Sequence, residues 1–546
     1  MNNLFNLARN GISVAQAAIR VTGDNLTNGM SGNYSRRSLI IGELGGMSTA
    51  QGFYGYGARA SGVERAYDAF ANNQLRDSLS GYASFTGRME QLADIDNMLA
   101  DEADNVSVSL GKLFKDMATL SGDPADGPAR AAVFTSLDVL ANRYNASAKR
   151  LSGLEKSTNT QIERSAKEIN SYTEQLAQLN TQLERLQGNG APPADLLDQR
   201  DALLEGLSEQ LGITVTEDQI SGRVSVTLPD GRPLVSGGTA YKLETSPSDA
   251  DPNKMIVSYV DANGKASPLD ENAITKGRLG GLFKFRNEDL TAARQDLDQI
   301  AFMMAHRMNE QHGEGLTPEG NPGGDLFSLP DIHAIANAKN RGGDALDQIA
   351  VINFKEVKSE NYDISFDGTD WVVKGADGRT VPLDPAAPPG TLRFDGIEIT
   401  LPNPSTAVAG DKFTLNPMAG AAEGISRKIT SAQDFAAADL TGGEGNNNNL
   451  EKMLEIQTEK LIGDDTLSAA YASLAGKIGE SAREVKSYAT SAESDLRTKY
   501  DTKQALSGVN MDEEYINLDM FRQYYNGSAQ LLKTATAMFD ALLAIR

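Results

Sequence analysis

The chain has 546 residues, too many for one typical domain, and its 40% hydrophobic and 23% charged residues are values of a globular protein. A formal charge of −23 argues against non-specific binding to nucleic acid or anionic lipid, because such binding needs a positive surface. The chain contains no cysteine, which excludes disulfides, thiolate metal sites and cysteine nucleophiles.

The sequence contains no signal for membrane insertion or cleaved export. No stretch approaches ~18 consecutive apolar residues, the length expected of a transmembrane helix. The first twenty residues lack a basic region followed by an apolar region, so we expect no cleaved secretory signal. If the protein leaves the cell, we expect it to use another route.

Residues 1–28 predict a helix with an apolar stripe. Phe5, Ile12, Ile19 and Leu26 recur every seven residues, and small residues beside them let a partner helix approach closely. The pair Asn28–Gly29 predicts the helix end, because Gly accepts the left-handed conformation needed there. The following stretch, residues 29–62, reads as a solvated loop in which Tyr34, Arg36 and Arg37 stand out.

The segment from residue 63 to residue 211 predicts long helices. The breaks fall at 121–128 and 188–193, where Gly, Pro and Asp cluster. Apolar residues then keep 3/4 spacing over 133–154 and 162–186, with a one-residue phase shift near Thr158. Roughly fifty residues of continuous helix span ~75 Å, so this segment predicts a rod.

Two stretches predict β-structure. Residues 213–268 alternate apolar and polar positions and predict a small β unit, after which helix returns over 279–311. Residues 325–417 contain three Asp–Gly pairs between short alternating runs, which favours hairpins. Asp363, Asp367 and Asp370 are spaced as in some calcium-binding loops, but the segment lacks the Gly and distal Glu of an EF-hand, which favours turn chemistry.

Residues 507–546 predict a second terminal helix. Asn510 is expected to cap it, with Glu513 bonding back in a capping box. The apolar stripe runs through Leu518, Phe521, Tyr525, Ser528, Leu532, Ala535, Phe539 and Leu542, with Ser528 the one polar member. Each large side chain contributes roughly 1.5–3 kcal/mol when buried, so we expect the N-terminal helix or another molecule to cover the stripe. The alternative is an ordinary core helix at each end.

These elements predict a mixed, mainly α fold with nested domains. Residues 1–45 and 507–546 form paired terminal helices, a coiled-coil assembly domain. Residues 46–324 and 418–506, including helix over 467–492, form a helical rod domain with the β unit at 213–268. Residues 325–417 form an inserted β-rich outer domain.

No enzyme signature appears in the sequence. It lacks a Gly-rich phosphate loop, a nucleophile elbow and a zinc-binding helix motif. His306 and His312 lie about 240° apart around a predicted helix, so they do not face one ligand. We therefore expect no catalytic, metal or cofactor site, with a site hidden in the inserted domain as the open alternative.

Several segments resemble the family of bacterial flagellar axial proteins. Residues 507–515, with Leu518, Phe521 and Tyr525 following, resemble the C-terminal signature of that family. Residues 24–28 and 34–36 resemble its N-terminal signature, with departures at Asp24 and Asn33. Segments 195–204, 231–237, 277–282 and 309–313 are similar to its hook-associated protein 1 branch.

The resemblance implies a non-enzymatic role in a junction layer between flagellar hook and filament. It implies export through the flagellar type III apparatus to the cell exterior, with four partners: further copies of the chain, hook protein, hook-associated protein 3 and an export chaperone. Nucleic acid and membrane are not expected partners. The expected assembly interface comprises Phe5, Ile12, Ile19, Asn25, Leu26, Asn28, Tyr34, Arg36, Leu518, Phe521, Tyr525, Leu532, Ala535, Phe539 and Leu542. The alternatives are a hook or distal rod protein of the same family, and a secreted adhesin or binding module that uses residues 325–417.

Overall fold

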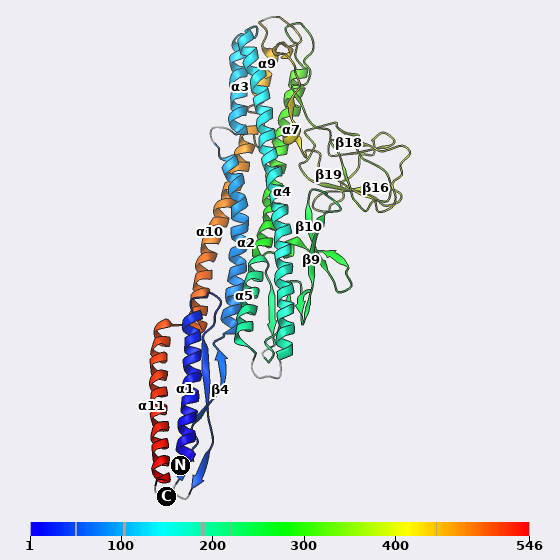
Figure 1. The fold of residues 1–546 in the computed structure, drawn as a ribbon. Coiled ribbons are helices and arrows are strands. Elements are labelled where there is room, and N and C mark those ends of the chain that lie inside the picture. Colours follow the sequence, from blue (N-terminus) through cyan, green and yellow to red (C-terminus); the bar gives the residue numbers. More distant parts are fainter. Residues whose placement is uncertain are drawn as a thin grey trace.

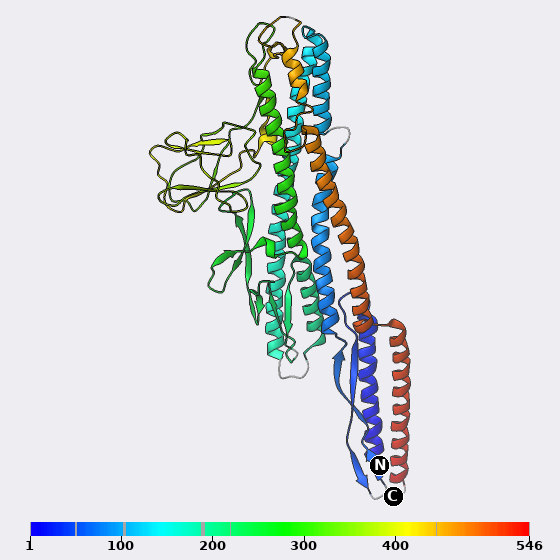
Figure 2. The same cartoon turned by 180° about the vertical axis from the view of Figure 1, so that it is seen from behind.

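The computed structural model describes residues 2–49, 52–101, 105–186, 192–218, 220–443 and 445–544. The chain forms a long helical rod, with a smaller helical module at one end and β-structure on one flank (Figure 1). Both termini lie together at the free end of the small module, as the view from behind also shows (Figure 2). The predicted fold class, mixed and mainly α, is confirmed.

We call residues 2–65 and 511–544 the terminal module. Its elements are α1 (Asn2–Asn28), β1 (Arg37–Glu43), β2 (Gly46–Thr49), β3 (Gly52–Gly55), β4 (Ala58–Arg65) and α11 (Met511–Leu543). Helices α1 and α11 pack side by side in opposite directions, and strands β1 and β4 pack on α1 (Figure 1). Helix α1 is therefore the middle layer.

The predicted loop over residues 29–62 is wrong. Strands β1 and β4 pair antiparallel from Arg37 opposite Arg65 to Glu43 opposite Ala58, with a bulge at Ile40 and Ile41. Strands β2 and β3 pair beyond them. Glycines weaken the local strand signal, and the hairpin lies along α1, a partner that strand periodicity does not show.

The rod consists of packed helices. They are α2 (Ala69–Leu99), α3 (Val106–Gly122), α4 (Gly127–Leu186), α5 (Ala194–Gln210), α6 (Gly277–Lys284), α7 (Thr291–Gly313), α9 (Asn448–Glu455) and α10 (Leu467–Ser507). Helix α4 has 60 residues and runs without a break through the predicted phase shift at Thr158, which is buried. A π-helical turn, Phe285–Leu290, joins α6 to α7. The predicted break at 188–193 lies largely outside the described residues.

The β unit consists of two small antiparallel sheets on the rod. One has the order β5-β6-β7-β8 and the other β11-β10-β9. Asn180 of α4 fixes the first sheet, since its side chain donates to Val224 O at 2.7 Å and accepts from Val224 N at 2.9 Å. The strands are β5 (Thr214–Glu217), β6 (Val224–Thr227), β7 (Pro233–Ser236), β8 (Thr239–Ala240), β9 (Lys242–Pro247), β10 (Met255–Val260) and β11 (Ala266–Pro268).

The β-rich segment after α7 projects from the flank of the rod. Its sheets have the orders β13-β19-β15-β16 and β14-β18-β17, and β12 pairs with β20 beside the rod. The Asp367 carboxylate accepts from the backbone of Thr369 and Asp370, so turn chemistry is confirmed at this position. The elements are β12 (Phe327–Ser328), β13 (Ile335–Ala336), β14 (Ile349–Val351), β15 (Tyr362–Phe366), β16 (Trp371–Lys374), β17 (Thr391–Phe394), β18 (Ile397–Thr400), β19 (Lys412–Leu415), α8 (Ala421–Gly424) and β20 (Ser426–Arg427).

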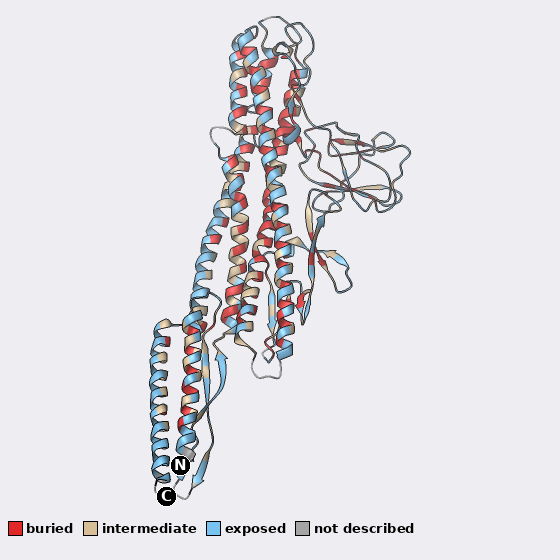
Figure 3. Ribbon diagram, viewed as in Figure 1, coloured by how far each residue is buried: buried red, intermediate tan, exposed pale blue. Residues whose placement is uncertain are grey.

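Two apolar clusters form the core of the described structure. One joins α2, α3, α4, α7 and α10 to the β-rich segment, and the other joins α4, α5 and α6 to the β unit. Within the described residues neither cluster contains a side chain of the terminal module. Figure 3 shows that α11 and the part of α10 nearest to it are mostly exposed, whereas α2, α4 and α7 carry many buried residues.

Candidate assembly interface at the terminal module

A stripe of small residues is the most deeply buried face of α1. It comprises Ala8, Gly11, Ala15, Ala18, Thr22 and Asn25, spaced by three and four. A Cβ atom added at Gly11 would lie 2.5 Å from Oγ of Ser528 on α11. The one polar member of the α11 stripe therefore meets Gly11, the one residue of the small-residue stripe that has no side chain, which lets the two helices approach closely.

Some of the predicted interface residues face the other helix, and others lie beside the contact between α1 and α11. On α11 the side chains of Leu518, Phe521, Tyr525, Leu532 and Ala535 are half-buried towards α1, whereas Phe539 is 53% exposed. The Leu542 side chain lies outside the described residues. On α1 the large residues lie beside the small-residue stripe: Phe5 is 48% exposed, and Ile12, Ile19 and Leu26 are half-buried.

Helix α11 also carries a second apolar stripe, and this one is exposed. This stripe consists of five residues spaced by four and seven positions: Ile516, Met520, Tyr524, Leu531 and Met538. Met520, Tyr524, Leu531 and Met538 each precede a residue of the first stripe by one, which places the two stripes about 100° apart around the helix. We call this set of five residues the outer stripe. Exposed apolar rows of this kind mark interaction surfaces.

Asn25 organises the polar end of the module. Its side-chain amide donates to Arg37 O at 2.8 Å and to Glu514 Oε2 at 3.0 Å. Its side-chain oxygen accepts from the Tyr34 hydroxyl at 2.8 Å and from Arg37 N at 3.0 Å. The buried amide thus uses its full hydrogen-bonding capacity, and it ties α1 to β1 and α11. Burial raises the pKa of Tyr34 to about 12.

A salt bridge lies beside Asn25 at the same end of the terminal module. Glu514 is buried and lies 2.9 Å from a guanidinium nitrogen of Arg36. The predicted cap at Asn510 is confirmed, because its side chain accepts from the backbone of residues 512 and 513. Glu513 does not complete a capping box; its carboxylate lies 3.0 Å from Arg36 instead. Asn28 lies apart from this cluster, exposed and bonded to Asp24 O within α1.

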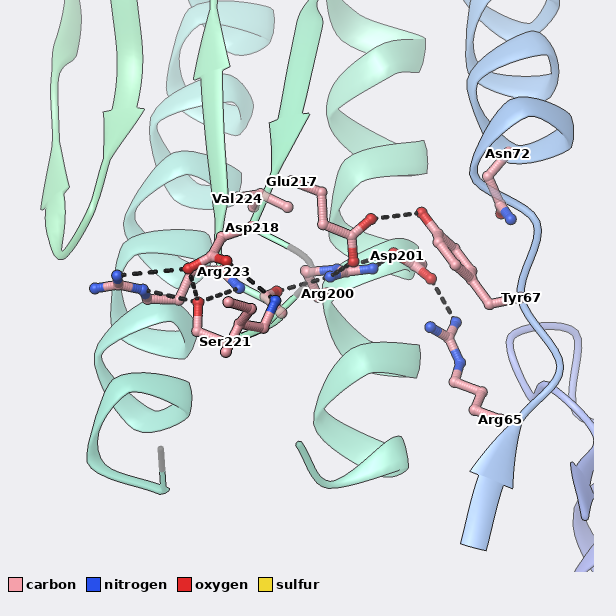
Figure 4. Close-up of polar contacts among 12 residues, drawn as sticks. Arg65, Tyr67, Asn72, Arg200, Asp201, Glu217, Asp218, Ser221, Arg223 and Val224 are labelled. Carbon is pink, nitrogen blue, oxygen red and sulfur yellow. Dashed lines mark hydrogen bonds and ion pairs between the residues drawn. The ribbon is translucent and has the colours of Figure 1, made fainter. Parts of the chain in front are cut away.

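A charged cluster of Arg37, Arg65, Asp198 and Asp201, which we call the joint, connects the module to the rod; Figure 4 shows Arg65 and Asp201 with the rod residues behind them. Arg65 Nε donates to Asp198 Oδ1 at 2.8 Å, and a second Arg65 nitrogen pairs with Asp201. Arg37 reaches the other oxygen of Asp198 at 3.4 Å. Both acids lie on α5, three residues apart and therefore on one face. Behind them Arg200 is fully buried and pairs with Asp201 at 2.8 Å.

The rod side of the joint is itself fixed. Arg200 also pairs with Glu217 of β5, and Glu217 accepts from the Tyr67 hydroxyl at 3.0 Å. Burial alone would raise the pKa of the Asp201 carboxyl, but the guanidinium groups of Arg200 and Arg65 hold it below its ordinary value. Burial raises the pKa of Tyr67 to about 12.

Sequence reasoning missed most of the joint. It singled out Arg37 but not Arg65, Asp198, Asp201 or Glu217. A local signal existed in the two acids three residues apart on a predicted helix. Their arginine partners lie far away in the sequence, however, and helix spacing does not show such pairs.

Within the described ranges no three His, Asp or Glu side chains group as a metal site, and no helix there is long and apolar enough to cross a membrane. A long helical rod with paired terminal helices, one of which carries an exposed apolar stripe, is typical of a structural protein.

Comparison with known proteins supports this class. The helical domain of flagellar hook-associated protein FlgK matches residues 92–327, and the D2-like domain of flagellar hook-associated protein 1 matches residues 335–417. Flagellar hook-associated protein 1 of Salmonella typhimurium is 36% identical over 557 residues, and that of Escherichia coli is 35% identical over 552; both matches cover 100% of each chain. The chain belongs to the flagellar hook-associated protein 1 family, whose members are structural components of the bacterial flagellum.

A solved structure has the same fold. The flagellar hook junction protein FlgK from Burkholderia pseudomallei superposes with a TM-score of 0.72 at 23% identity. The match covers 80% of this chain and 100% of that one.

Proposed function

We propose that this chain forms the junction layer between the flagellar hook and the filament, and that its copies associate through the terminal module. Membership of the hook-associated protein 1 family supports the junction role. The description of the Burkholderia pseudomallei relative as a hook junction protein supports it as well.

The outer stripe of α11 carries the proposal of self-association. Its spacing of four and seven residues is that of a helix-packing seam, and α1 already covers the other stripe. Each large apolar side chain contributes roughly 1.5–3 kcal/mol on burial, so the five exposed residues favour a further helix. Neighbouring copies offer such helices in α1 and α11.

The remaining partners follow from the proposed position. Hook protein adjoins one side of the layer and hook-associated protein 3 the other, and the chain reaches this place through the flagellar type III apparatus with an export chaperone. Asn25, Tyr34 and Arg36 hold α1, β1 and α11 together, so their place in the interface is to fix the shape of the module rather than to touch a neighbour.

Complementation of a deletion strain tests the proposal. Leu531→Asp in the outer stripe should leave hooks without filaments in electron micrographs, because a charge there opposes burial against a neighbour. Leu532→Asp and Phe539→Asp, in the stripe that faces α1, should do the same. Ala537→Asp is the matched control, since Ala537 is exposed on α11 and belongs to neither stripe.

The strain itself separates the candidate functions. A deletion that leaves hooks without filaments supports the junction role, whereas loss of both hook and filament indicates a hook or distal rod protein. Normal filaments in the deletion strain indicate an adhesin. Wild-type incorporation of the Leu531→Asp protein contradicts the role of the outer stripe.

A further inference from the structure

The contact between the terminal module and the rod is polar. Neither apolar cluster crosses it, and the side-chain contacts across it include ion pairs and hydrogen bonds, with the Arg65 guanidinium also 4.9 Å from the centre of the Tyr67 ring. Two short connections join the parts covalently: residues 66–68 between β4 and α2, and residues 508–510 between α10 and α11. Interfaces without a large apolar area permit relative motion of the parts they join.

The arginines at the joint form an unusual pair. Arg37 and Arg65 lie directly opposite each other in the β1–β4 ladder, where like charges are destabilising. Asp198 of α5 binds both, with one carboxylate oxygen for each arginine. Its side chain has no other partner among the described residues. Asp198 therefore acts only across the joint, whereas Asp201 also serves Arg200 within the rod.

Buried polar atoms around the joint lack partners. Within the described residues these are Arg37 Nε, Asn72 Oδ1, Arg76 Nη1 and Ser507 Oγ. A buried polar group without a hydrogen bond is costly, and it recovers its bonds when water reaches it. Separation of the two parts would therefore expose groups that favour water, so the charge contacts carry much of the attachment.

We propose that Asp198, with Arg37 and Arg65, is an electrostatic latch that fixes the angle between the terminal module and the rod, and that the latch opens while both parts stay folded. The partner recognised by Asp198 is the arginine pair at the root of the hairpin. The proposal concerns the single chain and does not depend on the junction role.

Each part keeps its own structure when the latch opens. The contacts of Asn25 and Glu514 lie within the terminal module, and the pairing of Arg200 with Glu217 lies within the rod. One backbone bond, from Arg36 N to Ser507 O at 2.8 Å, lies next to the connection at residues 508–510. The module would thus turn about the end of α10, with that bond near the axis.

Spin-label distance measurements on the full chain test the latch. The chain has no cysteine, so Gln530→Cys on α11 and Gln182→Cys on α4 give one label in each part. Both positions are exposed. A second pair, Gln16→Cys on α1 with Gln530→Cys, reports on the terminal module alone. Each pair is measured in the wild-type background, in Asp198→Asn and in Arg65→Met.

The control is a buried carboxylate that pairs within the rod. Asp289 binds Arg88 through both oxygens, at 2.7 and 2.8 Å, and makes no contact across the joint. Asp289→Asn therefore removes a comparable ion pair at another place. Circular dichroism of each variant shows whether the helices remain.

The latch predicts a narrow distance distribution across the joint in the wild type and one at least about two-fold broader in Asp198→Asn and Arg65→Met, because the remaining contact is small and polar. The pair within the module and the Asp289→Asn protein should keep the wild-type width. An unchanged width in both joint variants overturns the proposal, as does a broad distribution in the wild type. Loss of helicity together with broadening also overturns it, because opening would then require unfolding.

Discussion

Arg37 and Arg65 face each other across the first pair of the β1–β4 ladder, and a single carboxylate, Asp198, binds both. The hairpin root therefore depends on a residue of the rod for its charge balance. A pair of like charges in a ladder is tolerated here because the third group lies between them. The same contact connects the stability of the hairpin with the orientation of the terminal module.

The close approach at Gly11 gives the first prediction. Gly11→Leu should force α1 away from α11, because even a Cβ atom there lies 2.5 Å from Ser528 Oγ. We expect a loss of about 1–3 kcal/mol in the stability of the terminal module, typical of overpacking. Hydrogen exchange of the α1 and α11 amides measures it. Gly23→Leu is the control, since a Cβ atom at Gly23 meets no atom within 4 Å; equal exchange rates in the two variants would contradict the prediction.

The side-chain amide of Asn25 gives the second prediction. Asn25→Asp removes the donor to Arg37 O and Glu514 Oε2 and places a second carboxylate beside Glu514. The terminal module should lose about 1–3 kcal/mol. Hydrogen exchange of the α1 and α11 amides measures it, and Asn28→Asp on the exposed face of α1 should show no comparable loss.

His312 predicts acid sensitivity of the rod. Its ring is buried, contacts Gly324 O through Nδ1, and accepts from Ala436 N at 2.8 Å through Nε2. Burial lowers the pKa of His312 below its ordinary value. Its contribution to stability is therefore complete above the unfolded pKa of about 6.5 and is lost as the pH falls through the folded value.

Urea unfolding between pH 7.5 and 5 measures this effect. His312→Asn keeps a donor and an acceptor but does not titrate, so its free energy of unfolding should fall less with acid than that of the wild type. His333 is exposed, and His333→Asn should keep the wild-type slope. A wild-type slope in His312→Asn would reject the assignment.

Asp298 predicts the opposite pH dependence. Its carboxylate accepts from the backbone of Gly420 and Ala422, where the chain returns from the β-rich segment to the rod. Burial raises the pKa of Asp298 to about 6, despite these hydrogen bonds. A raised folded pKa means that its stabilisation is complete below the unfolded value and is lost as the pH rises through about 6.

Comparison with Asp298→Asn isolates that effect. The free energy of unfolding of the variant relative to the wild type should rise by about 3 kcal/mol between pH 4 and 8, from the two-unit difference in pKa. The difference in free energy of unfolding between variant and wild type at any one pH also depends on how well the introduced amide replaces the two acceptor oxygens of Asp298. Parallel curves for variant and wild type would show that Asp298 does not titrate in this range.

The rod helices could be predicted because the apolar residues that a helix buries recur every three or four positions in the sequence. Val133, Leu137, Tyr144 and Ile162 are all buried, as the 3/4 spacing predicts, since the helix itself fixes which residues share a face. The same spacing does not predict burial at the edge of the packed region. Tyr488, within the predicted helix over 467–492, is 48% exposed, and the centre of its ring lies 5.5 Å from that of Phe85.

The hairpin and the joint were not predictable from local pattern. The hairpin carries glycines and lies against α1, so its strands depend on a helix rather than on their own alternation. Asp198 and Asp201 lie in a segment noted for its resemblance, but their role depends on Arg65, which spacing along the chain does not place beside them. Glu514 lies in the first turn of the predicted helix that Asn510 caps, and only the fold shows that it is buried against Asn25 and Arg36.

The nested order of the rod has a consequence for how the chain folds. Helix α2 packs along α10, although the whole middle of the sequence separates them (Figure 1). Contacts between distant segments form late, because a long loop must close before they are made. The central hairpin of helices α3 and α4 can assemble from neighbouring residues, and α2 can pack on α5 and α6, whereas the contact between α2 and α10 forms only after the residues of α10 have emerged. If the chain emerges N-terminus first, the rod therefore cannot be completed until α10, near the C-terminus, has emerged.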